Sequence, residues 1–157
     1  MQVQIRRILI PTDFSEPAKE AQAYAIALAE RFDSELHLMH IVPQVTIPLP
    51  DSSSSWTLPD SDQRAQVKEA ETRLLQELDS KWAKERGVVQ VAKVGYAVEE
   101  IVQYAKEKEI DLIVIGTHGH SGLAHFILGS VAEKIVRMAN CPVLTVHPKG
   151  HQFISDK

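Results

Sequence analysis

The stretch Ile110–Val136, IDLIVIGTHGHSGLAHFILGSVAEKIV, decides the fold of this 157-residue chain. It opens with Leu112–Ile115, four apolar residues without a polar break. A short unbroken apolar run is typical of a strand buried on both faces, as the strands of parallel sheets are. Glycines follow this run at once, and a helical pattern begins near Ser130. This order predicts an anion cradle, because the free N–H groups and the positive dipole end of a helix N-terminus attract phosphate.

The glycine spacing separates this loop from two common phosphate-binding motifs. Gly116, Gly119 and Gly129-Ser130 form the pattern Gly-x2-Gly-x9-Gly-Ser, whereas the chain contains neither G-x4-G-K-[ST] nor G-x-G-x-x-G. Glycines can also mark simple turns, although three at one spacing after a buried strand make that interpretation weaker. The pattern resembles the ATP-binding branch of the universal stress protein family, and the resemblance extends from Arg7 to Val146.

Strands and helices alternate along the whole chain. Apolar runs predict five strands, Ile5–Ile10, Leu36–Val42, Val88–Val94, Leu112–Ile115 and Val143–Val146. Helical periodicity predicts a first helix capped by Ser15, a long helix over Gln63–Arg86, a helix after Gly95 and a last helix whose inward side chains include Val136. Alternation of this kind favours an α/β fold with a parallel sheet. The resemblance implies the strand order 3-2-1-4-5 with helices on both faces, a three-layer Rossmann-like arrangement.

The domain organisation follows from length and punctuation. We expect one nucleotide-binding domain over residues 1–147, followed by a flexible tail at 148–157. Residues 43–62 contain four prolines and the serine run Ser52–Ser55, and they predict a long mobile surface loop.

The strand order that the resemblance implies places the ends of the first and fourth strands side by side, where ligands of such sheets bind. Asp13 could then accept hydrogen bonds from a ribose hydroxyl or an adenine amino group, or simply form an Asx turn. Ser130 and Glu133 fit a capping box, which is compatible with donation from the Ser130 hydroxyl to a phosphate. Beyond Asp13 and Ser130, the nucleotide-binding residues that the resemblance implies are Pro11, Thr12, Ile41, Ile115, Gly116, Gly119, Gly129, Val131 and Ala132. A protonated His118 or His120 could also contact a phosphate, and His118 is counted with the nucleotide-binding residues.

Composition and charge exclude several classes of protein. The net charge of −4 and the absence of a basic stripe argue against nucleic-acid binding, and no apolar run reaches the ~20 residues of a membrane helix. The single cysteine, Cys141, is consistent with a cytoplasmic protein. The histidines His118, His120 and His125 lack the acidic partners and the spacing of a zinc site. Any Mg²⁺ would arrive with the nucleotide, because the phosphates supply most of its ligands.

Three functions are open at this point. The first is a regulatory stress-response module that binds ATP or another adenine nucleotide, has little or no turnover, and signals to a protein partner. The resemblance implies a homodimer paired through the edge strand 143–146. The second is a weak ATPase or adenylyl transferase, although no arginine lies between Arg86 and Arg137 to stabilise a transferring phosphoryl group. The third is a protein-interaction dimer without a nucleotide.

Overall fold

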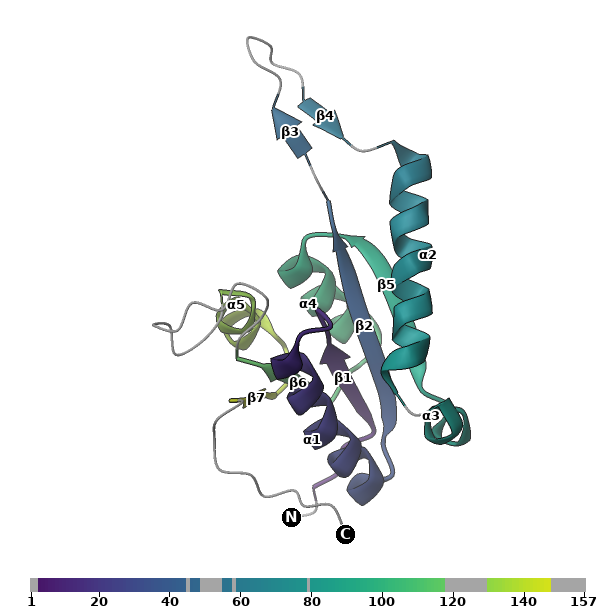
Figure 1. The fold of residues 1–157 in the computed structure, drawn as a ribbon. Coiled ribbons are helices and arrows are strands. Elements are labelled where there is room, and N and C mark those ends of the chain that lie inside the picture. The colour runs from purple at the N-terminus through teal and green to yellow at the C-terminus, as the bar shows by residue number, and fades with distance from the viewer. Residues whose placement is uncertain are drawn as a thin grey trace.

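A sheet of five parallel strands runs through the middle of the molecule (Figure 1). This computed structural model describes residues 3–44, 46–48, 55–57, 59–78, 80–117 and 130–147. The predicted tail at 148–157 lies outside the described residues. In spatial order the strands are β5 (Val89–Gly95), β2 (Glu35–Pro43), β1 (Arg7–Pro11), β6 (Leu112–Gly116) and β7 (Val143–Val146). This is the predicted order 3-2-1-4-5, and every pairing within the sheet is parallel.

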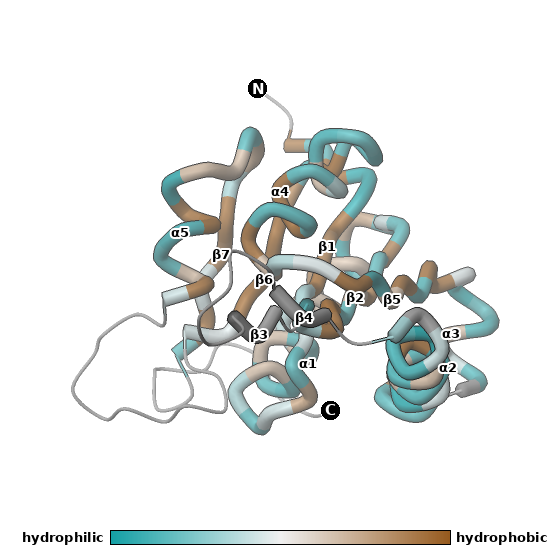
Figure 2. The backbone as a smooth tube through the Cα atoms, turned by 90° about the horizontal axis from the view of Figure 1, so that it is seen from above, coloured by the Kyte–Doolittle hydropathy of each residue, from teal (hydrophilic) through white to brown (hydrophobic). Residues whose placement is uncertain are grey.

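Helices cover both faces of the sheet (Figure 2). On one face lie α1 (Glu16–Phe32) and α2 (Asp60–Glu77), and on the other lie α4 (Ala97–Glu107) and α5 (Ser130–Met138). The short helix α3 (Ser80–Arg86) leads into β5, the edge strand next to β2. Among the described residues, no helix combines the length and the apolar character that a membrane span requires.

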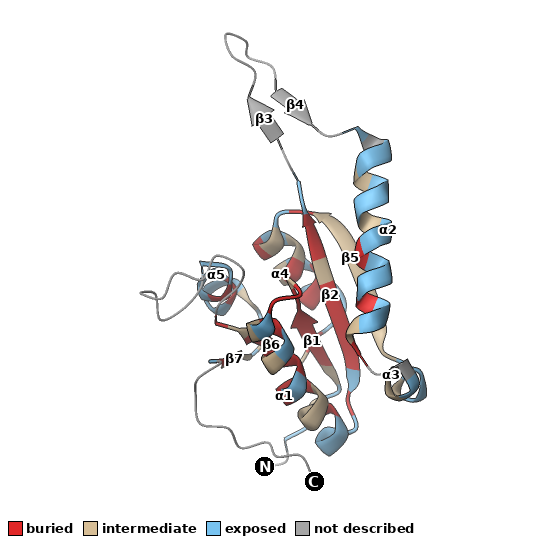
Figure 3. Cartoon of the chain, in the orientation of Figure 1, coloured by how far each residue is buried: buried red, intermediate tan, exposed pale blue. Residues whose placement is uncertain are grey.

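Each face of the sheet has its own hydrophobic core. Ile8 and Ile10 of β1 pack with α1 and with Leu74 of α2, whereas Leu9 between them packs with residues of α4 and α5. All three β1 side chains are fully buried, as is expected of a central parallel strand. Figure 3 shows this buried centre, and it also shows that α2 is exposed over most of its length.

The stretch 43–62 departs from the prediction of an irregular loop. Within it, β3 (Thr46–Pro48) and β4 (Ser55–Thr57) form a two-stranded antiparallel sheet, and α2 already begins at Asp60. Three-residue strands are too short to show an alternating pattern, and prolines are tolerated at the edges of such a ribbon. The residues 45, 49–54 and 58 within this stretch lie outside the described part.

The long helix predicted over Gln63–Arg86 is two helices. Leu78 takes an extended backbone conformation with φ −110° and ψ 151°, and this ends α2. The second helix, α3, then reaches the C-terminal end of α1. There Trp82 Nε1 donates to Glu30 Oε1 at 2.9 Å, and Arg86 pairs with Asp33 at 2.8 Å. Since these partners lie on another element, periodicity along the chain could not reveal the break.

The inward-facing prediction for the last helix is wrong at one position. Ala132 and Ile135 of α5 are buried, but Val136 is 47% exposed. The helix packs mainly against α4 and β7, so its buried face is narrower than its apolar pattern indicates.

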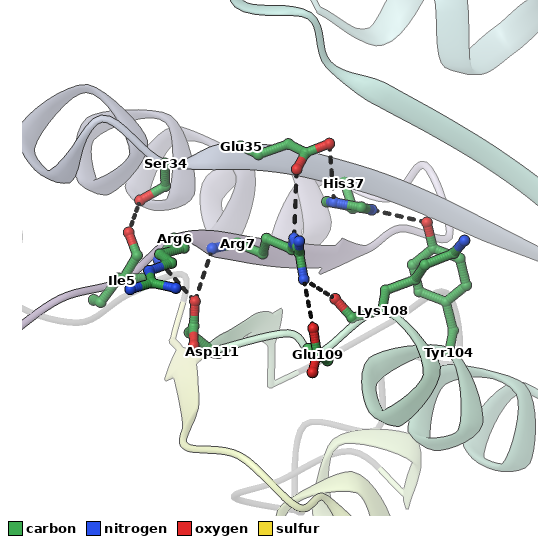
Figure 4. A network of polar contacts seen from close by, with 10 residues as sticks. All are labelled: Ile5, Arg6, Arg7, Ser34, Glu35, His37, Tyr104, Lys108, Glu109 and Asp111. Carbon is green, nitrogen blue, oxygen red and sulfur yellow. Dashed lines mark hydrogen bonds and ion pairs between the residues drawn. The ribbon is translucent and has the colours of Figure 1, made fainter.

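A polar network ties the amino ends of the central strands together, at the opposite edge of the sheet from the strands' carboxyl ends (Figure 4). Asp111 Oδ2 accepts from the backbone N–H groups of Arg6 and Arg7 at 2.7 and 3.0 Å. The Arg7 guanidinium lies 3.5 Å from Glu35 and 3.3 Å from Glu109. These contacts join β1, β2 and the turn before β6. They thereby fix the central strands relative to one another, including the carboxyl ends of these strands at the opposite edge of the sheet.

Candidate functional site

The carboxyl ends of β1 and β6 lie next to each other, as the family resemblance implied. Ile8 pairs with Leu112 and Leu9 with Ile113, so both strands run to the same edge of the sheet. After β1 the chain continues through α1 to β2 on one side, and after β6 it continues through α5 to β7 on the other. This is the topological switch point of a doubly wound sheet, where the two connections diverge and leave a crevice.

The loop after β1 is held by its own hydrogen bonds. Thr12 is buried, donates its N–H to Met39 O at 2.8 Å, and accepts from Phe14 N–H at 3.0 Å. Asp13 Oδ1 accepts from the N–H of Ser15 at 3.0 Å and from the Ser15 hydroxyl. Ser15 caps α1 as predicted, by accepting from Ala18 N–H at 3.4 Å.

Asp13 therefore forms the Asx turn that was one of its two interpretations. A carboxylate offers two oxygens and about four acceptor sites, so this turn leaves capacity for a ligand. The half-buried position of Asp13 beside the crevice is consistent with both roles.

Gly116 is glycine for a reason that lies in the fold. A Cβ atom at this position would stand 2.7 Å from Pro17 O and 3.0 Å from Pro17 C, both in the first turn of α1. Glycine was predicted to let another group approach its backbone closely. At Gly116 that group is the backbone of α1. The next residue, Thr117, is buried and donates its N–H to Val146 O at 2.9 Å, which ties the end of β6 to β7.

The first turn of α5 reaches the same side of the sheet as the end of β6. Ala132 belongs to the same core cluster as Ile115 and Ile41, whereas Ser130 and Val131 are exposed. The Glu133 carboxylate pairs with Arg137 at 3.0 Å, one turn further along α5.

The remaining predicted residues divide into two groups. Pro11 is buried at the end of β1, and the side chains of Ile41 and Ile115 belong to the core. His118, Gly119 and Gly129 lie outside the described residues, and so do His120 and His125. In the part of the chain that the structure describes, no three His, Cys, Asp or Glu side chains gather as a metal site.

Sequence reasoning missed three residues around the loop after β1. His40 Nδ1 donates to the carbonyl of Thr12 at 2.8 Å, and its ring lies 4.4 Å from that of Phe14. The guanidinium of Arg73, from α2, lies 4.0 Å from the centre of the Phe14 ring. These contacts join β2, α2 and the loop, and no spacing in the sequence signals them.

The fold is a doubly wound α/β domain in which the carboxyl ends of β1 and β6 are neighbours. The profile of the universal stress protein family matches residues 4–147, and the chain belongs to that family. Universal stress protein MJ0531 of Methanocaldococcus jannaschii is 38% identical over 146 residues, which cover 90% of this chain and 81% of that protein.

Solved structures agree with this assignment. Universal stress protein MJ0577 of the same organism is 32% identical over 162 residues, covering 96% of this chain and 99% of that one. The structure of MJ0577 superposes with a TM-score of 0.74 at 26% identity over 95% of this chain and 100% of its own. A universal stress protein solved in complex with cAMP shares the fold, with a TM-score of 0.65 at 24% identity over 92% of this chain and 99% of its own.

Proposed function

We propose that this chain is a regulatory module that binds an adenine nucleotide, in the first place ATP, in the crevice between β1 and β6. The observation that supports the proposal most strongly is the meeting of three features at one edge. They are the loop containing Asp13, the end of β6 at Gly116, and the first turn of α5. The chain also belongs to the universal stress protein family and contains the Gly-x2-Gly-x9-Gly-Ser pattern. One universal stress protein of the same fold was solved in complex with cAMP.

In this proposal each residue type has a defined task. The Asp13 carboxylate accepts from the ribose or the adenine, and the Ser130 hydroxyl and the N–H groups of Val131 and Ala132 bind phosphate oxygens. His118, Gly119 and Gly129 complete the phosphate loop by the family pattern, and Gly116 shapes the floor. The sides of the proposed crevice are formed by Pro11, Thr12, Ile41 and Ile115. Mg²⁺ enters bound to the phosphates.

The module acts as a switch rather than a catalyst. Its sequence has no P-loop lysine and no arginine between Arg86 and Arg137, so ATP turnover is expected to be slow. The proposal includes a homodimer through the β7 edge, a protein partner that reads the bound state, and a cytoplasmic location. Phosphate or AMP release well above the uncatalysed background would instead make the protein an enzyme.

Calorimetry with protein stripped of co-purified ligand tests the binding. We expect saturable ATP binding with a Kd near the micromolar range, about −8 kcal/mol. Gly129→Val should abolish binding without unfolding the chain, because a branched side chain would fill space next to the amides that grip phosphate.

Gly87→Asn is the matched control, because Gly87 ends α3 with φ +67° and has open space around it. Asparagine tolerates this left-handed conformation, so ATP binding should be unchanged. A Gly129→Val protein that binds ATP as tightly as the wild type would refute the phosphate loop.

A further inference from the structure

Phe14 occupies an unusual backbone conformation at the centre of the proposed site. Its φ of +64° lies in the left-handed region, which a bulky side chain rarely adopts. It stands between Asp13, whose carboxylate accepts from Ser15, and Ser15 itself, which caps α1. Surrounding contacts must therefore hold Phe14 in place, since the conformation is intrinsically unfavourable.

Those contacts come from two other elements of the fold. The Phe14 ring is only 7% exposed and lies 4.0 Å below the Arg73 guanidinium of α2. It also lies 4.4 Å from the His40 ring of β2, at an interplanar angle of 34°. A guanidinium over an aromatic face is attracted by the negative face of the ring. His40 Nδ1 also donates to Thr12 O. The loop is therefore held by contacts at two of its residues, Thr12 and Phe14.

The position of Asp13 depends on these contacts. Asp13 is the residue between Thr12 and Phe14, and its Oδ1 accepts from the N–H and the hydroxyl of Ser15. If Phe14 leaves the left-handed region, the peptide that follows Asp13 rotates and the carboxylate moves with it. Arg73 is an exposed residue of α2, and its contact with Phe14 links that helix directly to the loop, beside the shared core cluster that contains Leu74 and Phe14.

We propose that Arg73 and Phe14 are positioning residues through which α2 and the nucleotide site are coupled. The stack holds the loop in the conformation that presents Asp13, and nucleotide bound to Asp13 in turn holds Phe14 against Arg73. Coupling of this kind is reciprocal, so α2 should become more ordered when nucleotide binds. Through α2 the bound state also reaches the β3–β4 ribbon, which directly precedes that helix. This inference rests on the proposed function.

The test combines ATP affinity with hydrogen exchange along α2. Calorimetry should show that Arg73→Ala and Phe14→Leu each weaken ATP binding about five- to tenfold, and that the double variant is little weaker than either single variant. Arg73→Lys should recover part of the affinity, because it retains a cation over the ring. Lys68→Ala, which removes an exposed cation from the same helix, should bind ATP like the wild type.

Hydrogen exchange supplies the measurement that a merely structural role would not change. ATP should slow amide exchange in α2 of the wild type and of Lys68→Ala, but not in Arg73→Ala at a saturating ATP concentration. Wild-type affinity in Arg73→Ala, or the same ATP-dependent protection of α2 in that variant, overturns the coupling and leaves the nucleotide site standing. A wild type that binds no adenine nucleotide overturns the proposed function itself, and the coupling with it.

Discussion

At the scale of single residues, Gly116 decides how closely α1 can approach the sheet. A methyl group there would lie 2.7 Å from a backbone oxygen of α1, and neither the strand nor the helix can move away without repacking. We expect Gly116→Ala to lower the free energy of unfolding by about 1–3 kcal/mol, as overpacking of a core does. Urea unfolding at equilibrium measures this, and an unchanged midpoint would show that α1 is not held so tightly.

Asp13 has two roles that one substitution can separate. Asparagine keeps an oxygen for the Asx turn with Ser15 but lacks the charge that would bind a ribose hydroxyl or an adenine amino group most strongly. Asp13→Asn should therefore leave the unfolding free energy within about 0.5 kcal/mol of the wild type while weakening ATP binding about tenfold. Parallel unfolding and calorimetric titrations check this. Loss of stability with full ATP affinity would make Asp13 a purely structural residue.

The same residues show how far sequence could predict the site. A glycine directly after a buried strand predicted that some group lies close to its backbone. The sequence could not tell which group, because the contact of Gly116 comes from Pro17 of α1, about 100 residues earlier in the chain. Asp13 was recognised from its place at the end of a strand. Phe14, His40 and Arg73 were not recognised, because their contact exists only after three separate elements have folded together.

At the scale of elements, β7 is the edge strand beside β6, and within the described residues no further strand pairs with its other side. Ile113 N–H donates to Pro142 O and Thr117 N–H donates to Val146 O, so the even-numbered residues of this strand face β6. The backbone groups of Thr145 consequently point toward the open edge of the sheet. If the proposed dimer forms there, Thr145→Pro should remove one donor from the interface without breaking the pairing with β6.

We expect the Thr145→Pro protein to elute as a monomer at concentrations where the wild type is a dimer. Thr145→Val retains the backbone N–H and is the control, which should remain dimeric. Light scattering coupled to size exclusion measures both. A dimeric Thr145→Pro protein with unchanged affinity between protomers would place the interface elsewhere.

Secondary structure was predictable wherever a single period ran along the chain. The five strands of the main sheet and the cap of α1 agree with their apolar and capping patterns. The break at Leu78 was not predictable, because the apolar spacing continues to Trp82 while the contacts of α3 with α1 end the helix. The β3–β4 ribbon was not predicted either. Each of its strands has three residues, which are too few to show a periodic pattern.

At the scale of the whole molecule, burial of His37 makes stability depend on pH. His37 Nδ1 lies 2.8 Å from the Tyr104 hydroxyl, while Nε2 has no hydrogen-bond partner among the described residues and lies 3.6 Å from Glu35 Oε1. Burial lowers the pKa of His37 below its usual 6.5, and repulsion by Arg7 and Lys108 lowers it further, against the attraction of Glu35. The unfolded chain therefore binds more protons than the folded chain once the pH falls below about 6.5, and stability decreases.

His37→Gln should reduce this acid sensitivity, because glutamine does not titrate. We expect the variant to be less stable than the wild type at pH 7.5, owing to the altered contact with Tyr104, but to lose less stability between pH 7 and pH 5. Urea unfolding at several pH values measures both slopes. Equal losses in the two proteins would mean that other groups dominate acid unfolding.

The order of the strands is what brings the site together, and the sequence supplied it only through the resemblance. Alternating strands and helices predict a parallel sheet, but they do not state which strands are neighbours. The pairing of β1 with β6 across a sequence separation of about 100 residues brings the end of β1 next to the end of β6, and the proposed site is placed there.

The crystal structure of the protein grown with ATP tests the central claim most directly. We predict that the nucleotide lies at the carboxyl ends of β1 and β6, with phosphate oxygens about 3 Å from the N–H groups of Val131 and Ala132. The ribose or the adenine should lie within hydrogen-bond distance of Asp13. A crevice filled by the protein's own side chains, or ATP bound elsewhere on the molecule, would contradict the account.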